Sequence, residues 1–527
     1  MKNRKLLFSS IFVLLNISAV SKISALDIEF SLLPQIDFHT VGVFETAFSG
    51  TASMDFYPLT IRGRDKIGFS LQGGITDIKA QTLNDTPLYY GDFALDYSCR
   101  IHDRFGAGVQ AFAGFWKFPQ VEEKNTKAEN GILAGGRIFA EYYVLPELKA
   151  GVFAGMSKFL SEDDAFAQKF DLGLKLTYSF SKGIFKRSSV EMDESEVQNV
   201  FPVFYSFYNE NPFGKVVFFN GEENQINNVK VSVLIPEYMT NPKTCVEIPS
   251  VARSDYFNAD LTAFINETIL GSLMAHRTEC RIIVTYRSLG KTITSEHLLD
   301  INALNRNAMS WDDDRRAAAF VSSHDGAATK ISKLAKSLIL KNPTDDYTHN
   351  ISFARGIFAT LKAFGISYVK DPTSPFTSNL DQEIDFLQFP YQTLLYSGGD
   401  CDDLSILNCA LFESIGIEAA FITIPGHIFM AFDSGVSEAD AAKVIRDGRY
   451  IVQDGKVWIP LEATMCQESF EGERNAGWNQ WNSAKKKGEA ALYPIHEAWN
   501  LYKAVSVPES DTDIELPSLD RILKYLR

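Results

Sequence analysis

A cysteine, a histidine and a glutamate in the C-terminal part of the chain have the types and spacing that acyl transfer requires. Cys401 follows a Gly398-Gly399 turn and opens a predicted helix, where the helix dipole favours the nucleophilic thiolate. His427 opens a predicted strand after a Pro-Gly turn, and Glu462 ends another strand. If these strands are antiparallel neighbours, Glu462 orients His427 as a base that faces the thiol. We therefore predict a Cys-His-acid triad that forms an acyl-enzyme.

One helix and three strands must position these side chains. Apolar periodicity predicts the helix over residues 404–415, and continuous apolar runs predict strands at 417–424, 428–432 and 456–461. Upstream, apolar residues spaced by three or four over 327–365 predict helices that lead into this segment. The sequence thus predicts an α+β domain, with the triad where the helix meets the sheet.

Two further side chains are secondary candidates at this site. Gln392, together with the backbone N–H of Cys401, is the candidate donor pair of an oxyanion hole. Asp433, just past the strand of His427, is the fallback acid if Glu462 points away. The buried thiol Cys409, two helical turns after Cys401, is interpreted as a core residue.

Four runs of this sequence, in order, resemble the transglutaminase-like superfamily of papain-like fold. They are Gly-Asp-Cys-Asp-Asp at 399–403, Gly-Ile-Glu-Ala-Ala at 416–420, Gly-His at 426–427 and Trp-Ile-Pro-Leu-Glu-Ala-Thr at 458–464. The resemblance covers roughly residues 350–470. It differs at two points: Ile428-Phe429 stands where the family commonly has Ala-Trp, and Glu462 where it usually has Asp.

The resemblance implies roles for three residues. Cys401 is the nucleophile, His427 the general base and acid, and Glu462 the residue that orients the imidazole. The implied activity is attack on peptide or protein amide bonds, with proteolysis the first choice and transamidation the second. No cofactor is expected. The cluster of Asp400, Asp402 and Asp403 is explained by an acidic helix start, or by the Ca²⁺ that some periplasmic proteinases of this superfamily bind.

The N-terminal region, residues 26–182, is rich in Gly and Phe and alternates apolar and polar residues with period two. Such strands of about ten residues cross a bilayer when tilted. We predict an antiparallel barrel of about eight strands. The predicted segments are 27–38, 42–57, 66–79, 88–101, 104–117, 131–145, 147–159 and 168–181, with longer loops near 80–87, 118–130 and 160–167.

The pattern resembles eight-stranded outer-membrane barrels, because one face of the strands carries Asp, Lys, Arg and Gly and aromatic residues mark the strand ends. A soluble barrel of the lipocalin kind, with its apolar face inward, is the alternative. An even number of strands returns the chain to the side where it entered. The expected location is therefore the outer membrane, with the C-terminal domains in the periplasm.

The remaining segments complete a multidomain organisation. Residues 1–25, with basic residues before a short apolar run, are predicted to be a signal peptide. A charged linker is expected at 183–199 and a β-sandwich-like domain at 200–305, whose Cys245 and Cys280 either form a disulfide or stay as buried thiols. The transglutaminase-like domain with its helical lead-in takes up 306–470. A C-terminal helical extension is predicted over 471–527.

Composition limits the classes of partner. A net charge of −15 over 527 residues disfavours nucleic acid, which is bound mainly through Lys and Arg. Lipid of the outer membrane and a protein or peptide substrate are the expected partners. Two other functions stay open: a non-catalytic papain-like module that binds peptide or peptidoglycan, and a barrel that itself acts as a small pore or adhesin.

Overall fold

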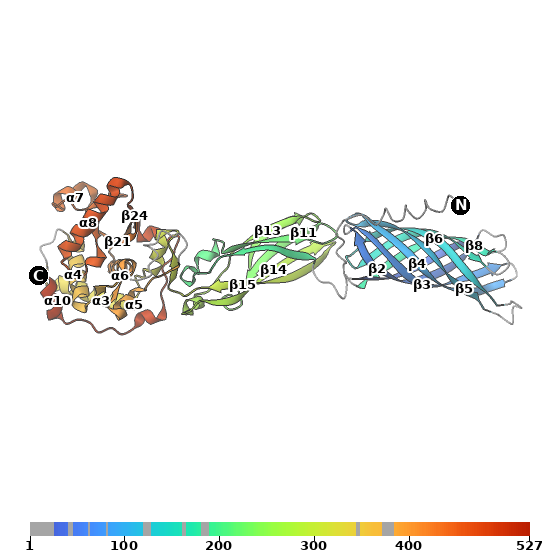
Figure 1. Cartoon of the computed structure of the whole chain (residues 1–527), viewed down its shortest axis with the longest axis horizontal. Helices are drawn as coiled ribbons and strands as arrows, with labels where there is room; N and C mark the ends of the chain where they lie inside the picture. The colour runs from blue at the N-terminus through green and yellow to red at the C-terminus, as the bar shows by residue number, and fades with distance from the viewer. Residues whose placement is uncertain are drawn as a thin grey trace, which may run out of the picture.

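The computed structural model places three parts in a row along an elongated molecule: an N-terminal barrel, a middle pair of sheets and a C-terminal α+β domain (Figure 1). The structure describes residues 26–39, 46–61, 64–80, 83–119, 128–160, 165–180, 189–343, 348–370 and 384–526. The predicted signal peptide lies outside the described residues, as does most of the loop between the first two strands.

Eight antiparallel strands close into a barrel in which each strand pairs with its neighbours in sequence and β1 pairs with β8. The strands are β1 (Asp27–His39), β2 (Ala47–Ile61), β3 (Asp65–Ala80), β4 (Leu83–His102), β5 (Phe105–Phe118), β6 (Glu129–Tyr143), β7 (Leu148–Leu160) and β8 (Ala165–Ser179). The predicted number of strands and the closed barrel are confirmed. The predicted loop at 80–87 is wrong, because β3 and β4 continue as a hairpin to Ala80 and Leu83.

The barrel is apolar outside and polar inside. Outward-facing side chains such as Phe48 and Phe115 are 74% and 73% exposed. The lumen instead holds buried ion pairs: Lys149 with Glu29 at 2.6 Å, and Lys169 with Asp37 at 2.8 Å. Period-two alternation builds both faces, since successive side chains of a strand point to opposite sides. This polarity is the reverse of a lipocalin, whose lumen is apolar.

Two antiparallel sheets pack face to face in the middle part. One has the order β13-β10-β9 and the other β12-β11-β14-β15. The strands are β9 (Val190–Val197), β10 (Gly214–Asn220), β11 (Ile226–Leu234), β12 (Lys243–Val251), β13 (Tyr256–Leu261), β14 (His276–Ser288) and β15 (Lys291–Ala303). Across the interface, the rings of Phe218 and His297 lie 5.2 Å apart. The arrangement is a seven-stranded sandwich.

The predicted linker at 183–199 is wrong in its second half, because residues 190–197 form β9 at the edge of the first sheet. The acidic residues there hide the apolar–polar alternation that predicts a strand. An edge strand tolerates charged side chains, and their charge keeps it from pairing with other chains. Cys245 and Cys280 are separate free thiols in the structure. The thiol of Cys245 lies 3.3 Å from the carbonyl oxygen of Thr262.

The sandwich contacts the end of the barrel that carries the tight turns. Arg100, near the end of β4, donates a 2.7 Å hydrogen bond to Glu223 of the sandwich. Lys291, which begins β15, forms a 2.9 Å ion pair with Glu147 of the turn between β6 and β7. These charged contacts join the two parts at two separate turns of the barrel mouth, so we call them the mouth contacts.

The C-terminal part is built on a sheet with the order β22-β23-β21-β20-β24. Its strands are β20 (Ala419–Ile424), β21 (His427–Asp433), β22 (Ile451–Gln453), β23 (Lys456–Leu461) and β24 (Ala491–Pro494). Its helices are α3 (Gly326–Lys341), α4 (His349–Phe364), α5 (Pro390–Tyr396), α6 (Cys401–Glu413), α7 (Glu438–Val444), α8 (Phe470–Lys487), α9 (Ile495–Ala498) and α10 (Leu519–Leu526). Short strand pairs join β16 (Ala308–Ser310) to β18 (Ile384–Phe386) and β17 (Ser367–Tyr368) to β19 (Gly398–Gly399).

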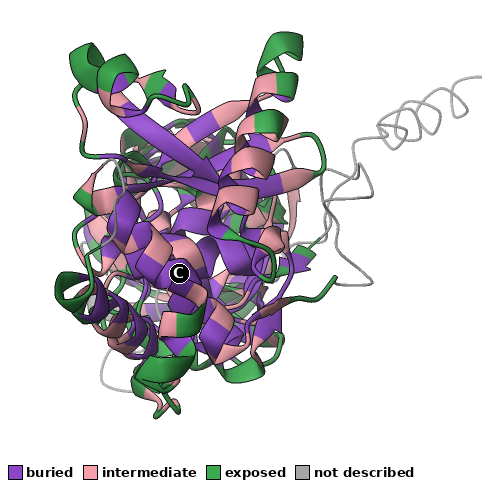
Figure 2. Ribbon diagram, turned by 90° about the vertical axis from the view of Figure 1, so that its left-hand side faces the viewer, coloured by how far each residue is buried: buried purple, intermediate pink, exposed green. Residues whose placement is uncertain are grey.

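Helices cover both faces of this sheet, whose strands are buried in the centre of the domain (Figure 2). Helix α6 packs on one face, where the rings of Phe412 and Phe432 stack 4.8 Å apart. Trp481 of α8 packs on the other face, in a cluster with Phe429 and Trp458. The packing of α6 on the sheet fixes the start of α6 beside the start of β21.

The predicted helical extension over 471–527 is only partly correct. Helix α8 ends at Gly488, which has a positive φ of 74°. The next segment, β24, pairs with β20 and becomes the fifth strand of the central sheet. The spacing of apolar residues over 482–505 predicts a helix there. Instead, Gly488 ends α8, because glycine readily adopts a positive φ. The free edge of β20 then provides hydrogen-bonding partners for the Ala-Leu-Tyr-Pro run of β24.

Candidate active site

Cys401 is the first residue of α6, directly after the short strand β19. Asp400 is the N-cap of the helix, and Asp403 completes a capping box with it. Glycine is needed at position 399, because a Cβ there would lie 2.5 Å from the Cβ of Asp403. The close approach of strand and helix places the thiol at the positive end of the helix dipole, as predicted.

His427 and Glu462 form a hydrogen-bonded pair in which the glutamate is buried and the histidine is partly exposed. The strands β21 and β23 are antiparallel neighbours, with Met430 opposite Leu461. His427 Nε2 lies 2.8 Å from Glu462 Oε2. The other carboxylate oxygen of Glu462 accepts hydrogen bonds from the backbone N–H and the hydroxyl of Thr464, at 3.2 and 2.7 Å. Because both oxygens have partners, the carboxylate is fixed and sets the orientation of the imidazole ring.

Cys401 lies close enough to His427 to raise the pKa of the imidazole. Since Nε2 faces Glu462, the other ring nitrogen, Nδ1, is the one available to the thiol. Burial by itself lowers the pKa of His427, but the interactions with Cys401 and Glu462 and their negative charges outweigh it and raise the pKa to about 10. The ring is then protonated at neutral pH and can stabilise a thiolate. The three residues that the sequence singles out therefore meet in one place.

The two secondary candidates have other partners. The side-chain oxygen of Gln392 accepts hydrogen bonds from the backbone N–H of Phe389, at 2.8 Å, and from the side chain of Asn307, at 2.7 Å. These bonds fix the start of α5, and a role of Gln392 in an oxyanion hole stays a prediction. Asp433 ends β21, six residues from His427, and accepts from the backbone N–H of Gly435 at 2.9 Å. The fallback is not needed, because Glu462 points toward His427.

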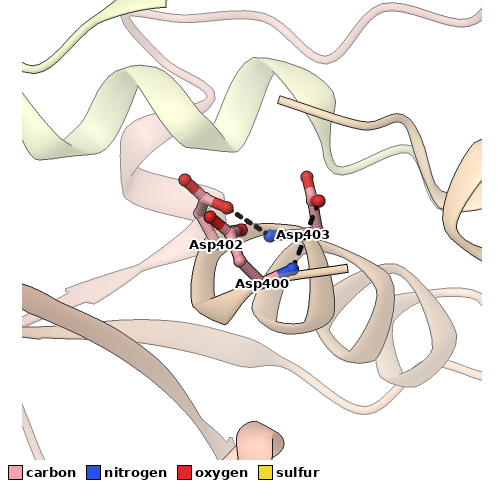
Figure 3. Close-up of side chains that lie close together, drawn as sticks. All are labelled: Asp400, Asp402 and Asp403. Atoms are coloured by element: carbon pink, nitrogen blue, oxygen red, sulfur yellow. Dashed lines mark hydrogen bonds between the residues drawn. The ribbon is translucent and has the colours of Figure 1, made fainter. Parts of the chain in front are cut away.

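Three buried carboxylates surround the start of α6, as Figure 3 shows for Asp400, Asp402 and Asp403. One oxygen from each lies within 4.8 Å of the others. Asp402 accepts from the backbone N–H of Asp403 at 2.7 Å, and Asp403 accepts from the backbone N–H of Gln388 at 2.7 Å. Among the described residues, Asp400 Oδ1 has no hydrogen-bond partner. Carboxylate oxygens with a spare acceptor fit a Ca²⁺ ion.

A proton can take the place of a cation in this cluster. Burial raises the pKa of Asp402 well above its usual range, and the neighbouring carboxylates of Asp400 and Asp403 raise it further. Burial and the charge of Asp400 raise the pKa of Asp403 to about 7. Because a raised carboxyl pKa means that the folded state binds the proton more tightly, stability falls as pH rises from about 4 toward and beyond 7.

We expect Asp402→Asn to flatten this pH dependence. In EDTA, the unfolding temperature of the wild-type protein should fall between pH 5 and pH 8, and that of the variant should fall less. At pH 8 the free energy of unfolding of the variant should exceed that of the wild type by about 1 kcal/mol. Thermal unfolding followed by circular dichroism measures both. Equal slopes would contradict the shared-proton interpretation. Added Ca²⁺ that stabilises the wild type but not the variant would identify a cation as the occupant.

Three residues beside the triad were missed by the sequence analysis. Thr464 holds Glu462, and the Glu-Ala-Thr run could have indicated it, because side chains at helix starts commonly bond two residues onward. Ser405 donates to the carbonyl oxygen of Cys401 at 2.6 Å. Tyr368 lies on β17 beside β19, and no local pattern indicates a pairing of segments thirty residues apart.

The N-terminal fold defines the class of the protein. A closed eight-stranded barrel with an apolar exterior and a lumen filled by ion pairs is the architecture of transmembrane barrels of the outer membrane. The chain is thus an outer-membrane-type barrel protein with a large C-terminal extension. No helix among the described residues has the length and apolar character needed to span a membrane.

Three solved structures are similar to the barrel part of the chain. Neisserial surface protein A is 11% identical, with a TM-score of 0.25, and the match covers 29% of this chain and 96% of that one. The N-terminal barrel domain of Pseudomonas aeruginosa OprF is 10% identical over 28% of this chain and 97% of that one, with a TM-score of 0.20. Ail of Yersinia pestis is 11% identical over 29% and 97%, with a TM-score of 0.20. No protein-family model and no curated protein matches the chain.

Proposed function

We propose that the protein is an outer-membrane-anchored, periplasmic cysteine hydrolase of transglutaminase-like fold, which acts on peptide or protein amide bonds. The observation that carries the proposal is the 2.8 Å hydrogen bond between His427 Nε2 and Glu462 Oε2, together with Cys401 close enough to His427 to raise its pKa. A thiol at a helix N-terminus, a protonated imidazole and a fixed carboxylate are the parts of a Cys-His-acid triad.

In the proposed reaction, the thiolate of Cys401 attacks the carbonyl carbon of the amide and forms a C–S bond. His427 gives its proton to the amide nitrogen, so that the C–N bond breaks and the amine leaves. His427 then takes a proton from water, which attacks the thioester and releases the acid and Cys401. An amine in place of water gives transamidation, the second choice. Bound Ca²⁺ would be held by Asp400, Asp402 and Asp403 and would offset their negative charge beside the thiolate.

The mouth contacts support the proposed location. They involve the short turns of the barrel near Arg100 and Glu147, whereas the longer connection between β5 and β6, residues 119–128, is at the other end. Outer-membrane barrels have short turns on the periplasmic side and long loops outside. The sandwich and the candidate active site then lie in the periplasm, and the predicted signal peptide at 1–25 is consistent with export.

The test is the rate of alkylation of Cys401 by iodoacetamide in the full-length protein in detergent micelles, measured by mass spectrometry between pH 5 and 9. At pH 6 an ordinary thiol, with a pKa of about 8.5, is less than about 1% thiolate. We expect Cys401 to react roughly 10- to 100-fold faster at this pH in the wild type than in His427→Ala, because the imidazolium stabilises the thiolate.

The buried thiols Cys409 and Cys466 serve as internal controls in the same digest. Their labelling should be slow and indifferent to His427→Ala. The proposed enzymatic function would be refuted if Cys401 were alkylated no faster than an ordinary thiol and at the same rate in the variant. The non-catalytic module that binds peptide or peptidoglycan would then be the better function.

A further inference from the structure

Tyr368 is held beside the nucleophile by backbone pairing. Strand β17 runs parallel to β19, with Tyr368 opposite Gly399, two residues before Cys401. The backbone N–H of Val369 donates a 2.9 Å hydrogen bond to the carbonyl oxygen of Gly399. Because paired strands lie about 4.8 Å apart, the backbone of Tyr368 is close to the residues that lead into α6.

Tyr368 is placed on the face of the β17–β19 pair that meets the first turn of α6. Paired residues of neighbouring strands point to the same face of a sheet. A Cβ at Gly399 would point at Asp403 of α6, from which it would be 2.5 Å away. The absence of a side chain at Gly399 leaves this face to Tyr368, whose side chain is neither buried in the core nor fully in solvent, since the residue is 44% exposed.

The surroundings of Tyr368 keep its hydroxyl as a hydrogen-bond donor. Burial raises the pKa of Tyr368, and the nearby negative charges of Cys401, Asp400 and Glu462 raise it further. The phenol therefore stays protonated at neutral pH. In contrast, the oxygen of Gln392 is fixed by two hydrogen bonds at the start of α5.

We propose that the Tyr368 hydroxyl donates a hydrogen bond to the oxyanion that forms when Cys401 attacks a carbonyl group. This catalytic role rests on the proposed function of Cys401. The second donor is the backbone N–H of Cys401, which as the first N–H of α6 has no partner within the helix. When the thiolate adds to the carbonyl carbon, the C=O electron pair moves to oxygen, and the two donors stabilise that charge until the leaving group departs.

The test compares two reactions of the same thiol in the full-length protein in micelles at one pH. Acylation by p-nitrophenyl acetate passes through an oxyanion, whereas alkylation by iodoacetamide is a displacement at a CH₂ group and does not. We expect Tyr368→Phe to slow acylation roughly 100-fold, the usual effect of removing one oxyanion donor, and to leave alkylation unchanged. Tyr256→Phe, at a 56% exposed tyrosine of the sandwich, is the matched control and should change neither rate.

Each other outcome overturns the inference in a different way. Unchanged or faster acylation in Tyr368→Phe, with fast alkylation, refutes the oxyanion role and leaves the proposed function intact. Slower alkylation in Tyr368→Phe means that Tyr368 acts on the thiolate rather than on the oxyanion. Slow alkylation of Cys401 in the wild type refutes the proposed function, and the role of Tyr368 with it.

Discussion

Replacing Cys401 with alanine is expected to abolish hydrolysis of p-nitrophenyl acetate by the full-length protein, by roughly 10⁴-fold or more. Removal of a nucleophile typically costs this much, because no other group can form the acyl-enzyme. Cys401 is only partly buried, so the unfolding temperature should change little. The measurement is the rate of p-nitrophenolate release, with an initial burst in the wild type if deacylation is slower than acylation.

The control for this prediction is Cys245→Ala, which removes a partly buried thiol in the sandwich, outside the candidate site. It should hydrolyse the ester at the wild-type rate. Activity that survives in Cys401→Ala but not in Cys245→Ala would move the nucleophile away from α6. Such a result would contradict the triad at its first residue.

Glu462→Gln is expected to lower kcat by about 10³- to 10⁴-fold. The glutamine can still accept from Thr464, so the local fold is kept. With its oxygen on Thr464, the glutamine turns its NH2 group, which can only donate, toward His427 Nε2. The imidazolium then loses its hydrogen-bond acceptor, its compensating charge and its orientation; the same change in other triads has an effect of this size. Steady-state kinetics with p-nitrophenyl acetate measure the loss.

Asp433→Asn is the matched control, because Asp433 lies at the other end of the strand that carries His427. It should leave kcat unchanged. Equal losses in Glu462→Gln and Asp433→Asn would indicate damage to the sheet rather than loss of the acid. A loss in Asp433→Asn alone would restore the fallback that the geometry does not support.

The barrel was predictable because two features of the sequence identify its strands. Period-two alternation identifies each strand, and the polar face identifies the lumen, as the pairs of Lys149 with Glu29 and of Lys169 with Asp37 show. The end of a hairpin is less certain. Nothing in residues 80–87 distinguishes a loop from the extended ends of β3 and β4, because pairing beyond the membrane needs no apolar face.

Segments that depend on distant partners were not predictable. The strand β9 carries too many acidic residues to have a strand pattern and is stabilised by its pairing with β10. The strand β24 has only four residues and is stabilised by hydrogen bonds to the edge of β20. In both, hydrogen bonds to another part of the chain override the local pattern.

The candidate site also has residues that could be predicted and residues that could not. Cys401, His427 and Glu462 each follow or end a recognisable element, so their meeting followed from a simple topology. Tyr368 reaches the site through two residues of parallel pairing with β19, which only the folded chain reveals. The residues that hold a triad in place are therefore harder to predict than the triad.

The mouth contacts have a consequence for how far from the barrel the candidate active site is held. The pairs Arg100–Glu223 and Lys291–Glu147 brace the sandwich against the barrel at two separate points, so it cannot swing freely as a flexible tether would. The 13 residues of β14 rise about 43 Å, at about 3.3 Å per residue. The candidate active site is then held at a set distance from the barrel. Under the proposed function, substrates at that distance from the membrane meet it at a high local concentration, and proteins farther away are spared.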